Sequence, residues 1–167
     1  KALNLPLKII SLGGMKDSSY LLGHSQTYQD SKCGIIIQSI IESKVINPIL
    51  YFDELDKVSN SEYGQDIYSV LSNLTDPTIN SNFKDRYFSN LSVNLSKVFY
   101  VFTFNDISKI NKVLLDRLNV VYVSNPTKTE KVTILKNYCL QDIKENVGIP
   151  LEIDFDNDCY SIVIDYT

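Results

Sequence analysis

Short apolar runs and longer amphipathic segments alternate along the chain. Short, mainly apolar runs at residues 7–12, 49–52, 98–103 and 120–123 predict strands, and the last three are typical of strands buried on both faces of a sheet. Between and after these runs, apolar residues recur every three or four positions, which predicts helices. The expected helices cover residues 35–45, 66–74, 110–117 and 127–145. Strands that alternate with helices predict an α/β fold with a parallel sheet.

The pattern changes after the last apolar run, where a helical segment begins. Thr127 and Glu130 have the spacing of a capping box, in which two side chains satisfy backbone N–H groups of the first helical turn. A Gly-Ile-Pro break follows at residues 148–150. We therefore expect an α/β subdomain over residues 1–125 and a smaller helical lobe over residues 126–167.

The composition predicts a packed globular chain. Of its 167 residues, 44% are hydrophobic and 22% are charged. The formal net charge is −4 and no basic stripe occurs, so we do not expect duplex nucleic acid as a partner. Cys33, Cys139 and Cys159 are odd in number and far apart, which argues against a disulfide framework and a zinc site. No apolar run approaches the roughly 18 residues of a membrane span, and no membrane partner is expected.

The first candidate chemistry lies at the end of the second apolar run. Asp53 and Glu54 follow residues 49–52 directly, and open α/β sheets bind ligands at the carboxyl ends of their strands. This is the pattern of a Walker B element, in which the Asp holds Mg²⁺ through its water shell and the Glu polarises a water. A strand that ends at a solvated acidic turn has the same pattern, so this stretch alone leaves both interpretations open.

Two further sequence features occur near the other predicted strands. Asn105 comes just after the apolar run at 98–103, and Leu114-Leu115-Asp116-Arg117 comes just before the run at 120–123. Together with the Asp-Glu strand end, they resemble the core of the AAA+ ATPases.

The remaining sequence narrows this resemblance. It includes Ile10-Ser11-Leu12-Gly13-Gly14, Gly23-His24, Thr27-Tyr28, Asn47-Pro48, Phe52 to Lys57, Leu71, Leu74, Asp76-Pro77, Asn80, Phe83, Asp85, Tyr87, Leu95 to Val98 and Thr103. The part from Leu71 to Tyr87 is not shared by AAA+ proteins in general. Over residues 1–167 the chain resembles the ATPase module of Lon-type ATP-dependent serine proteases.

The resemblance implies a P-loop nucleoside-triphosphatase fold of the AAA+ type. Its parallel sheet has the strand order 5-1-4-3-2 between two helical layers, followed by the start of a small helical lid. The apolar runs correspond to strands 2, 3, 4 and 5 in chain order, and strand 1 is missing from this chain.

The resemblance also implies a role for each candidate residue. Asp53 is expected to hold Mg²⁺ through water, and Glu54 to act as the catalytic base. Asn105 would be the sensor 1 residue that orients the attacking water, so that Asp53, Glu54 and Asn105 face ATP. Arg117 would be an arginine finger that acts on the nucleotide of the next subunit.

Pore loops are a further expectation from the resemblance. Tyr28 would grip an unfolded polypeptide, although Gln29 and Asp30 follow it where family loops have an aliphatic residue and a glycine. Tyr63, in the loop at 60–66, would belong to a second pore loop. The implied partners are unfolded proteins and identical subunits in a ring, expected to be a hexamer, in bacterial cytoplasm or the mitochondrial matrix. His24, the single histidine, is expected to be a structural loop residue.

No G-x-x-x-x-G-K-[ST] phosphate-binding loop occurs in the 167 residues. The resemblance places that loop and strand 1 upstream of Lys1, so we expect an inactive fragment. We also expect either a gap beside residues 98–103 or a shift of residues 120–123 into that gap. A remodelling ATPase without a protease, and a degenerate interaction module without catalysis, remain as alternatives.

Overall fold

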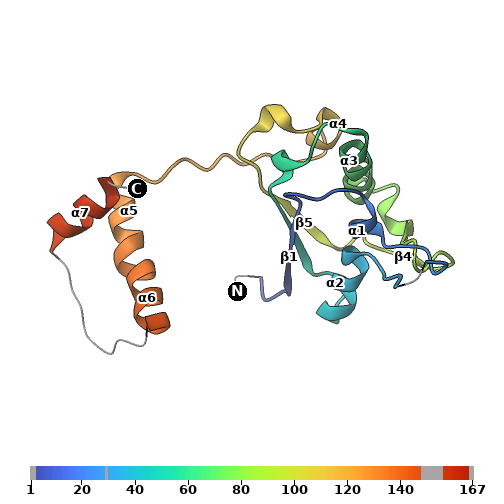
Figure 1. Cartoon of the computed structure of the whole chain (residues 1–167), viewed down its shortest axis with the longest axis horizontal. Coiled ribbons are helices and arrows are strands. Elements are labelled where there is room, and N and C mark those ends of the chain that lie inside the picture. The colour runs from blue at the N-terminus through green and yellow to red at the C-terminus, as the bar shows by residue number, and fades with distance from the viewer. Residues whose placement is uncertain (1–2, 29, 148–155, 166–167) are drawn as a thin grey trace. The chain divides into compact units, whose positions relative to one another are not determined.

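The structure is a computed structural model that describes residues 3–28, 30–147 and 156–165. It divides into two compact units, Lys1–Asn119 and Val120–Thr167 (Figure 1). The second unit therefore begins at residue 120, earlier in the sequence than the expected boundary at residue 125.

Unit 1 is built on a parallel sheet of three strands. Its strands are β1 (Leu7–Ser11), β2 (Ile49–Asp53) and β5 (Phe99–Phe102), in the order β1-β2-β5. Three of the four predicted strands are therefore confirmed, and their order agrees with the predicted order of strands 2, 3 and 4. The register places Leu7 beside Ile49 and Ile49 beside Phe99, so the carboxyl ends of all three strands meet at one edge.

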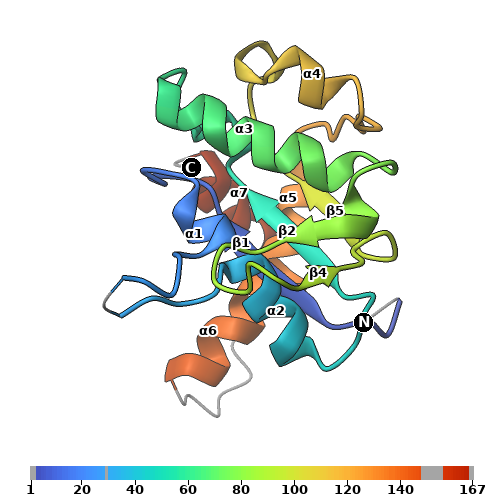
Figure 2. The ribbon, with the colours of Figure 1, turned by 90° about the vertical axis from the view of Figure 1, so that its right-hand side faces the viewer.

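Helices cover one face of this sheet. The helices α1 (Ser19–Leu22), α2 (Ile35–Ser43) and α3 (Glu62–Thr75) lie on the same side of the strands (Figures 1 and 2), and α4 (Lys112–Leu115) follows β5. Ile10, Leu50 and Phe52 point into this core and are at most 1% exposed. The Phe52 ring stacks on Phe102, with centroids 5.1 Å apart.

The predicted third layer is absent from the described residues of unit 1, which is a correction. The connections β1–α2–β2 and β2–α3–β5 run in the same direction across the sheet. Because parallel crossovers are right-handed, both helices are placed on one face. The opposite face carries Leu7, Ile9 and Phe99, which are 53%, 67% and 56% exposed. The strands are therefore buried on one side only.

The predicted strand at residues 120–123 is also wrong. These residues form no strand, and Val121, Tyr122 and Val123 are 80–90% exposed, with values of 82%, 81% and 90%. An apolar run becomes a strand only where a neighbour accepts its backbone hydrogen bonds. Among the described residues β5 pairs only with β2, so of the two expected outcomes the gap beside residues 98–103 is found and the shift of 120–123 is not.

The start of α3 is a further correction. The helix begins at Glu62 and not at residue 66, so Tyr63 lies in its first turn and the predicted loop at 60–66 is mostly helical. Ser61 caps the helix by accepting a hydrogen bond from the Gly64 amide at 3.4 Å.

A small hairpin follows α3. It consists of β3 (Phe83–Lys84) and β4 (Ser92–Val93), which are antiparallel and are preceded by the 3₁₀ turn η2 (Asn80–Asn82). These strands are too short to be predicted from alternation. Phe83 is 8% exposed and joins the hairpin to the core.

Unit 2 is helical in its described part. It contains α5 (Lys128–Ile134), the π-helical turn η4 (Leu135–Cys139), α6 (Leu140–Val147) and α7 (Asn157–Asp165). The capping box of Thr127 and Glu130 is confirmed. Lys128 pairs with Asp165 at 2.6 Å, and Lys136 lies 4.6 Å from the centre of the Tyr160 ring. The break predicted at 148–150 lies outside the described residues. None of the described helices has the length and apolar character needed to cross a lipid bilayer.

Candidate functional site

The acidic pair lies where the parallel strands end. Asp53 is the last residue of β2 and is half-buried. Its Oδ1 accepts hydrogen bonds from the Thr103 hydroxyl, just past β5, and from the Glu54 amide at 3.0 Å. Its Oδ2 accepts no hydrogen bond from the described part of the chain. One carboxylate oxygen is therefore fixed, and the other can face a ligand such as a hydrated cation.

Glu54 follows in a left-handed backbone conformation. Its φ is 59° and its ψ is 45°, values that few residues other than glycine adopt. The next residue, Leu55, donates its amide to the Thr103 carbonyl at 2.9 Å, which fixes the turn against the end of β5. The Glu54 carboxylate lies against Gly13, just past the end of β1, where a Cβ would collide with it. Glu54 therefore lies between two neighbouring strand ends, and Gly13 provides the space for its side chain.

Asn105 lies at the same edge and is exposed. The Thr103 amide donates to the Phe52 carbonyl of β2 at 3.0 Å, which holds the chain after β5 beside the acidic pair. Asp106 caps the 3₁₀ turn η3 (Ile107–Lys109) by accepting from the Ser108 hydroxyl at 2.6 Å and the Ser108 amide at 3.0 Å. These two bonds, the hydroxyl first, hold the pKa of Asp106 below its ordinary value. The connection that carries Asn105 is thus fixed at both ends.

Arg117 lies in the turn after α4 and is bonded within unit 1. Its Nη2 is 3.0 Å from Asp76 Oδ2, and its Nη1 donates to the Ser72 carbonyl in the last turn of α3. A cation at a helix C-terminus is favourable, so the guanidinium stabilises the end of α3. An action on a neighbouring subunit therefore requires the guanidinium to leave these partners or to use its remaining N–H donors.

The two candidate pore residues are both accessible. Tyr28 is 67% exposed in the loop between α1 and α2, and Tyr63 is 63% exposed in the first turn of α3. Within the loop, the Tyr28 amide donates to the Ser25 carbonyl at 3.1 Å, and its ring centroid lies 6.4 Å from that of His24. His24 is exposed and lies in the loop, as expected for a loop residue.

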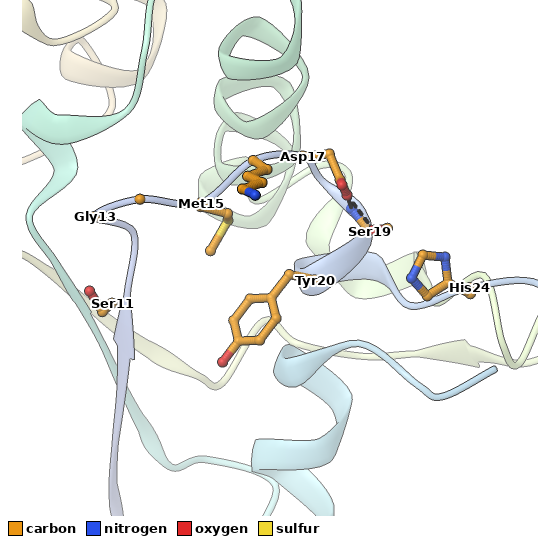
Figure 3. Close-up of a pocket in the computed structure, with 9 residues that line it drawn as sticks. Ser11, Gly13, Met15, Asp17, Ser19, Tyr20 and His24 are labelled. Atoms are coloured by element: carbon orange, nitrogen blue, oxygen red, sulfur yellow. Dashed lines mark hydrogen bonds between the residues drawn. The ribbon is translucent and has the colours of Figure 1, made fainter. Parts of the chain in front are cut away.

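A cavity of about 470 Å³ lies between the end of β1 and α1 (Figure 3). The Tyr20 ring extends from α1 towards the strand that carries Ser11 (Figure 3). Hydrogen bonds from the Ser19 hydroxyl and amide lower the pKa of Asp17 at its rim. The lining residues are Ser11, Gly13, Gly14, Met15, Lys16, Asp17, Ser19, Tyr20 and His24. Of these, Ser11 is the strand partner of Asp53 and Gly13 lies against the Glu54 carboxylate, so the cavity is a neighbour of the candidate site.

The sequence pattern gave no site role to two residues that shape the site, although both belong to the resemblance. Thr103 donates to Asp53, and Gly13 borders Glu54. Both lie just after strands that flank β2, and this position beside the Asp-Glu strand end is the signal that could have identified them. Among the described residues no group of three His, Cys, Asp or Glu side chains could hold a metal ion. The Mg²⁺ expected at Asp53 needs only one carboxylate, because Mg²⁺ keeps several waters and binds substrate phosphates.

Comparisons with known proteins identify close similarities along the whole chain. No protein-family model matches it. The Lon protease of Helicobacter pylori is 40% identical over 166 residues, which are 99% of this chain and 20% of that protein. The Lon protease of Campylobacter jejuni is 40% identical over 169 residues, covering 100% of this chain and 21% of that protein. A Lon protease homolog of Acanthamoeba polyphaga mimivirus is 36% identical over 166 residues, or 98% of this chain and 16% of the relative.

The chain thus spans about a fifth of the length of the curated relatives that it matches. Nearly all of this chain matches one segment of the Lon-type proteases.

Proposed function

We propose that this chain belongs to the module of a Lon-type ATP-dependent protease that hydrolyses ATP and threads unfolded protein towards the protease. Residues 1–167 contain no phosphate-binding loop, so we propose that by themselves they are inactive. The observation that carries the proposal is the acidic pair at the carboxyl end of β2, with Asp53 Oδ1 fixed by Thr103 and Glu54 placed beside Gly13. The similarity to Lon proteases supports it.

The residues at the strand ends fit an ATP-hydrolysing centre. When bound, ATP would supply the phosphate that is cleaved and Mg²⁺ would neutralise its charge. Asp53 would bind the metal's water shell through Oδ2, the oxygen that accepts no hydrogen bond from the residues that the structure describes. Glu54 would take the proton of the attacking water, and Asn105 would orient that water by its side-chain amide.

The other candidate residues fit a ring of identical subunits, which we propose to be a hexamer. Arg117 would act on the nucleotide of the next subunit, so that hydrolysis depends on assembly. Tyr28 and Tyr63 would contact the polypeptide, because an exposed aromatic ring can bind many side chains without reading a sequence.

The test is the degradation of an unfolded model protein by the full-length protein. We expect peptide-bond cleavage that requires both ATP and Mg²⁺ and stops when ADP replaces ATP. Cleavage that proceeds equally without nucleotide would contradict the proposal. Hydrolysis of ATP with translocation but without cleavage would instead support a remodelling ATPase.

Gly13→Ala tests the placement of Glu54. Gly13 has no left-handed φ, so alanine fits its backbone, but the added Cβ would displace the Glu54 carboxylate. We expect ATP hydrolysis by the full-length protein to fall by about 10²-fold while ATP affinity changes little, because a base displaced by about 1 Å loses its alignment.

Gly14→Ala is the matched control for Gly13→Ala. It adds the same methyl group one residue later, where no atom lies within 4 Å, although its φ of +75° is unfavourable for alanine. We therefore expect a loss of stability of about 1 kcal/mol with hydrolysis largely kept. If Gly13→Ala hydrolyses ATP at the rate of the Gly14→Ala variant, Gly13 does not position Glu54.

A further inference from the structure

A buried carboxylate joins two segments that are far apart in the sequence. Asp85 is 1% exposed and lies directly after β3. Its Oδ2 accepts a hydrogen bond from the Gly34 amide at 2.8 Å, and its Oδ1 accepts one from the Tyr87 amide at 2.8 Å. Because an unpaired buried carboxylate is costly, these two amides compensate its burial. Gly34 is the residue at which the loop after α1 ends and α2 begins.

The two ends of that loop touch backbone to backbone. We define the loop base as residues 23–24 and 32–34. The His24 amide donates to the Lys32 carbonyl at 3.1 Å. A Cβ on Gly23 would lie 2.7 Å from both Gly34 N and Lys32 O and 3.0 Å from Asp85 Oδ1, and a Cβ on Gly34 would collide with the Leu21 carbonyl. Only glycines at positions 23 and 34 allow the two backbone segments of the loop base to lie this close together.

The hairpin segment that carries Asp85 contacts both sides of the loop base. On one side the Arg86 amide donates to the Leu22 carbonyl, directly before Gly23, at 2.8 Å. On the other side Asp85 accepts from Gly34. In the sequence, Tyr28 lies between the two attached residues, Leu22 and Gly34, and its side chain is 67% exposed. The hairpin therefore holds the point from which Tyr28 projects.

We propose that Asp85 is a positioning residue for Tyr28, because its carboxylate closes the base of the loop from which Tyr28 reaches the polypeptide. This inference rests on the proposed role of Tyr28 in gripping substrate. A loop can pull on a polypeptide only if its own attachment to the core is stiffer than the structure being unfolded. With the base open, Tyr28 would move relative to the sheet and the nucleotide cycle would no longer move the substrate.

Cys33, within the loop base, reports the state of the base. Its side chain is half-buried, and burial first and the Asp85 charge second raise the pKa of its thiol. Because the thiolate is the reactive form, a closed base keeps alkylation of Cys33 slow. Cys139 and Cys159 are exposed and lie in unit 2, so they serve as internal references.

The experiment is Asp85→Asn in the full-length protein. Asparagine keeps the size of the side chain but removes the charge and turns an amide donor towards a backbone N–H. We expect Cys33 alkylation by iodoacetamide at about pH 8 to become about tenfold faster relative to Cys139, read by peptide mass spectrometry. The amount of folded protein degraded per ATP hydrolysed should fall about tenfold, because the gripping residue is misplaced.

Two further variants separate an open loop base from other effects of the Asp85→Asn substitution. Gly34→Ala opens the base by collision while Asp85 stays intact, and its φ of −67° suits alanine, so it should reproduce both changes. Asn94→Ala is the matched control, since Asn94 accepts the Ser96 amide at 3.0 Å on the same hairpin without contacting the loop base. It should change neither readout.

Each outcome decides the proposal. Loss of the Asp85 charge alone lowers the pKa of the Cys33 thiol, so faster alkylation in Asp85→Asn without faster alkylation in Gly34→Ala would show that Asp85 does not close the base. Unchanged alkylation in both variants would show the same. Faster alkylation with unchanged degradation per ATP would show that the base does not position Tyr28. Equal effects of Asn94→Ala would assign the change to the hairpin in general. Tyr28→Ala separates the underlying function: if it leaves degradation per ATP unchanged, the role of Tyr28 fails, while the Cys33 rate still tests the loop base.

Discussion

Glu54→Gln in the full-length protein is expected to bind ATP and to hydrolyse it at least about 10²-fold more slowly, since glutamine cannot accept the proton of the attacking water. Glutamine has the size of glutamate, so it can occupy the space beside Gly13 and keep the turn after β2. The side chain is exposed at the end of β2. We therefore expect the thermal unfolding midpoint to change little. The measurements are the steady-state rate of phosphate release and the equilibrium binding of ATP.

Glu145→Gln is the matched control for this prediction. Glu145 is an exposed glutamate on α6 in unit 2, so the same chemical change there should leave ATP hydrolysis intact. Turnover by Glu54→Gln at the rate of Glu145→Gln would exclude Glu54 as the base. Loss of ATP binding together with hydrolysis would point to a role in holding the nucleotide instead.

Arg117→Ala is expected to reduce ATP hydrolysis by about 10³-fold or more, the usual effect of removing an arginine finger. The same substitution removes the ion pair with Asp76 and the hydrogen bond to Ser72, so some stability is lost as well. Asp76→Asn separates the two effects. It weakens the same ion pair but leaves the guanidinium free to reach a neighbouring subunit, so we expect a similar shift in unfolding with hydrolysis kept.

Mixing subunits tests whether Arg117 acts in trans. A mixture of Glu54→Gln and Arg117→Ala subunits contains interfaces where an intact Glu54 meets an intact Arg117 from the neighbour. We expect hydrolysis to reappear on mixing two inactive preparations. If the mixture stays inactive although mixed rings form, or if Asp76→Asn is as inactive as Arg117→Ala, Arg117 serves only to stabilise the end of α3.

The amino-acid sequence by itself was sufficient to predict the three strands of the parallel sheet in unit 1. The apolar runs that became β1, β2 and β5 are predicted from local pattern, because a strand with a buried face needs apolar side chains wherever it lies. The place of Asp53 and Glu54 at the end of β2 follows from the same run. The capping box at Thr127 is local as well, since both of its partners lie within one helical turn.

Only the tertiary structure decided which apolar positions are covered. Leu7 and Val121 look as apolar as Leu50, yet they are exposed, because burial depends on a neighbouring layer or strand that the local pattern does not contain. Residues 120–123 fail as a strand for the same reason.

The contacts that define the site were likewise decided by packing between distant residues. Thr103 reaches Asp53 across a strand pair, Glu54 lies against Gly13, and Asp85 accepts the Gly34 amide 51 positions away. Residue types at such separations do not predict their own partners, since many pairings have the same chemistry. The sequence thus determined which residues carry the candidate chemistry, and the parallel sheet determined which of them meet, because it brings the ends of separate strands to one edge.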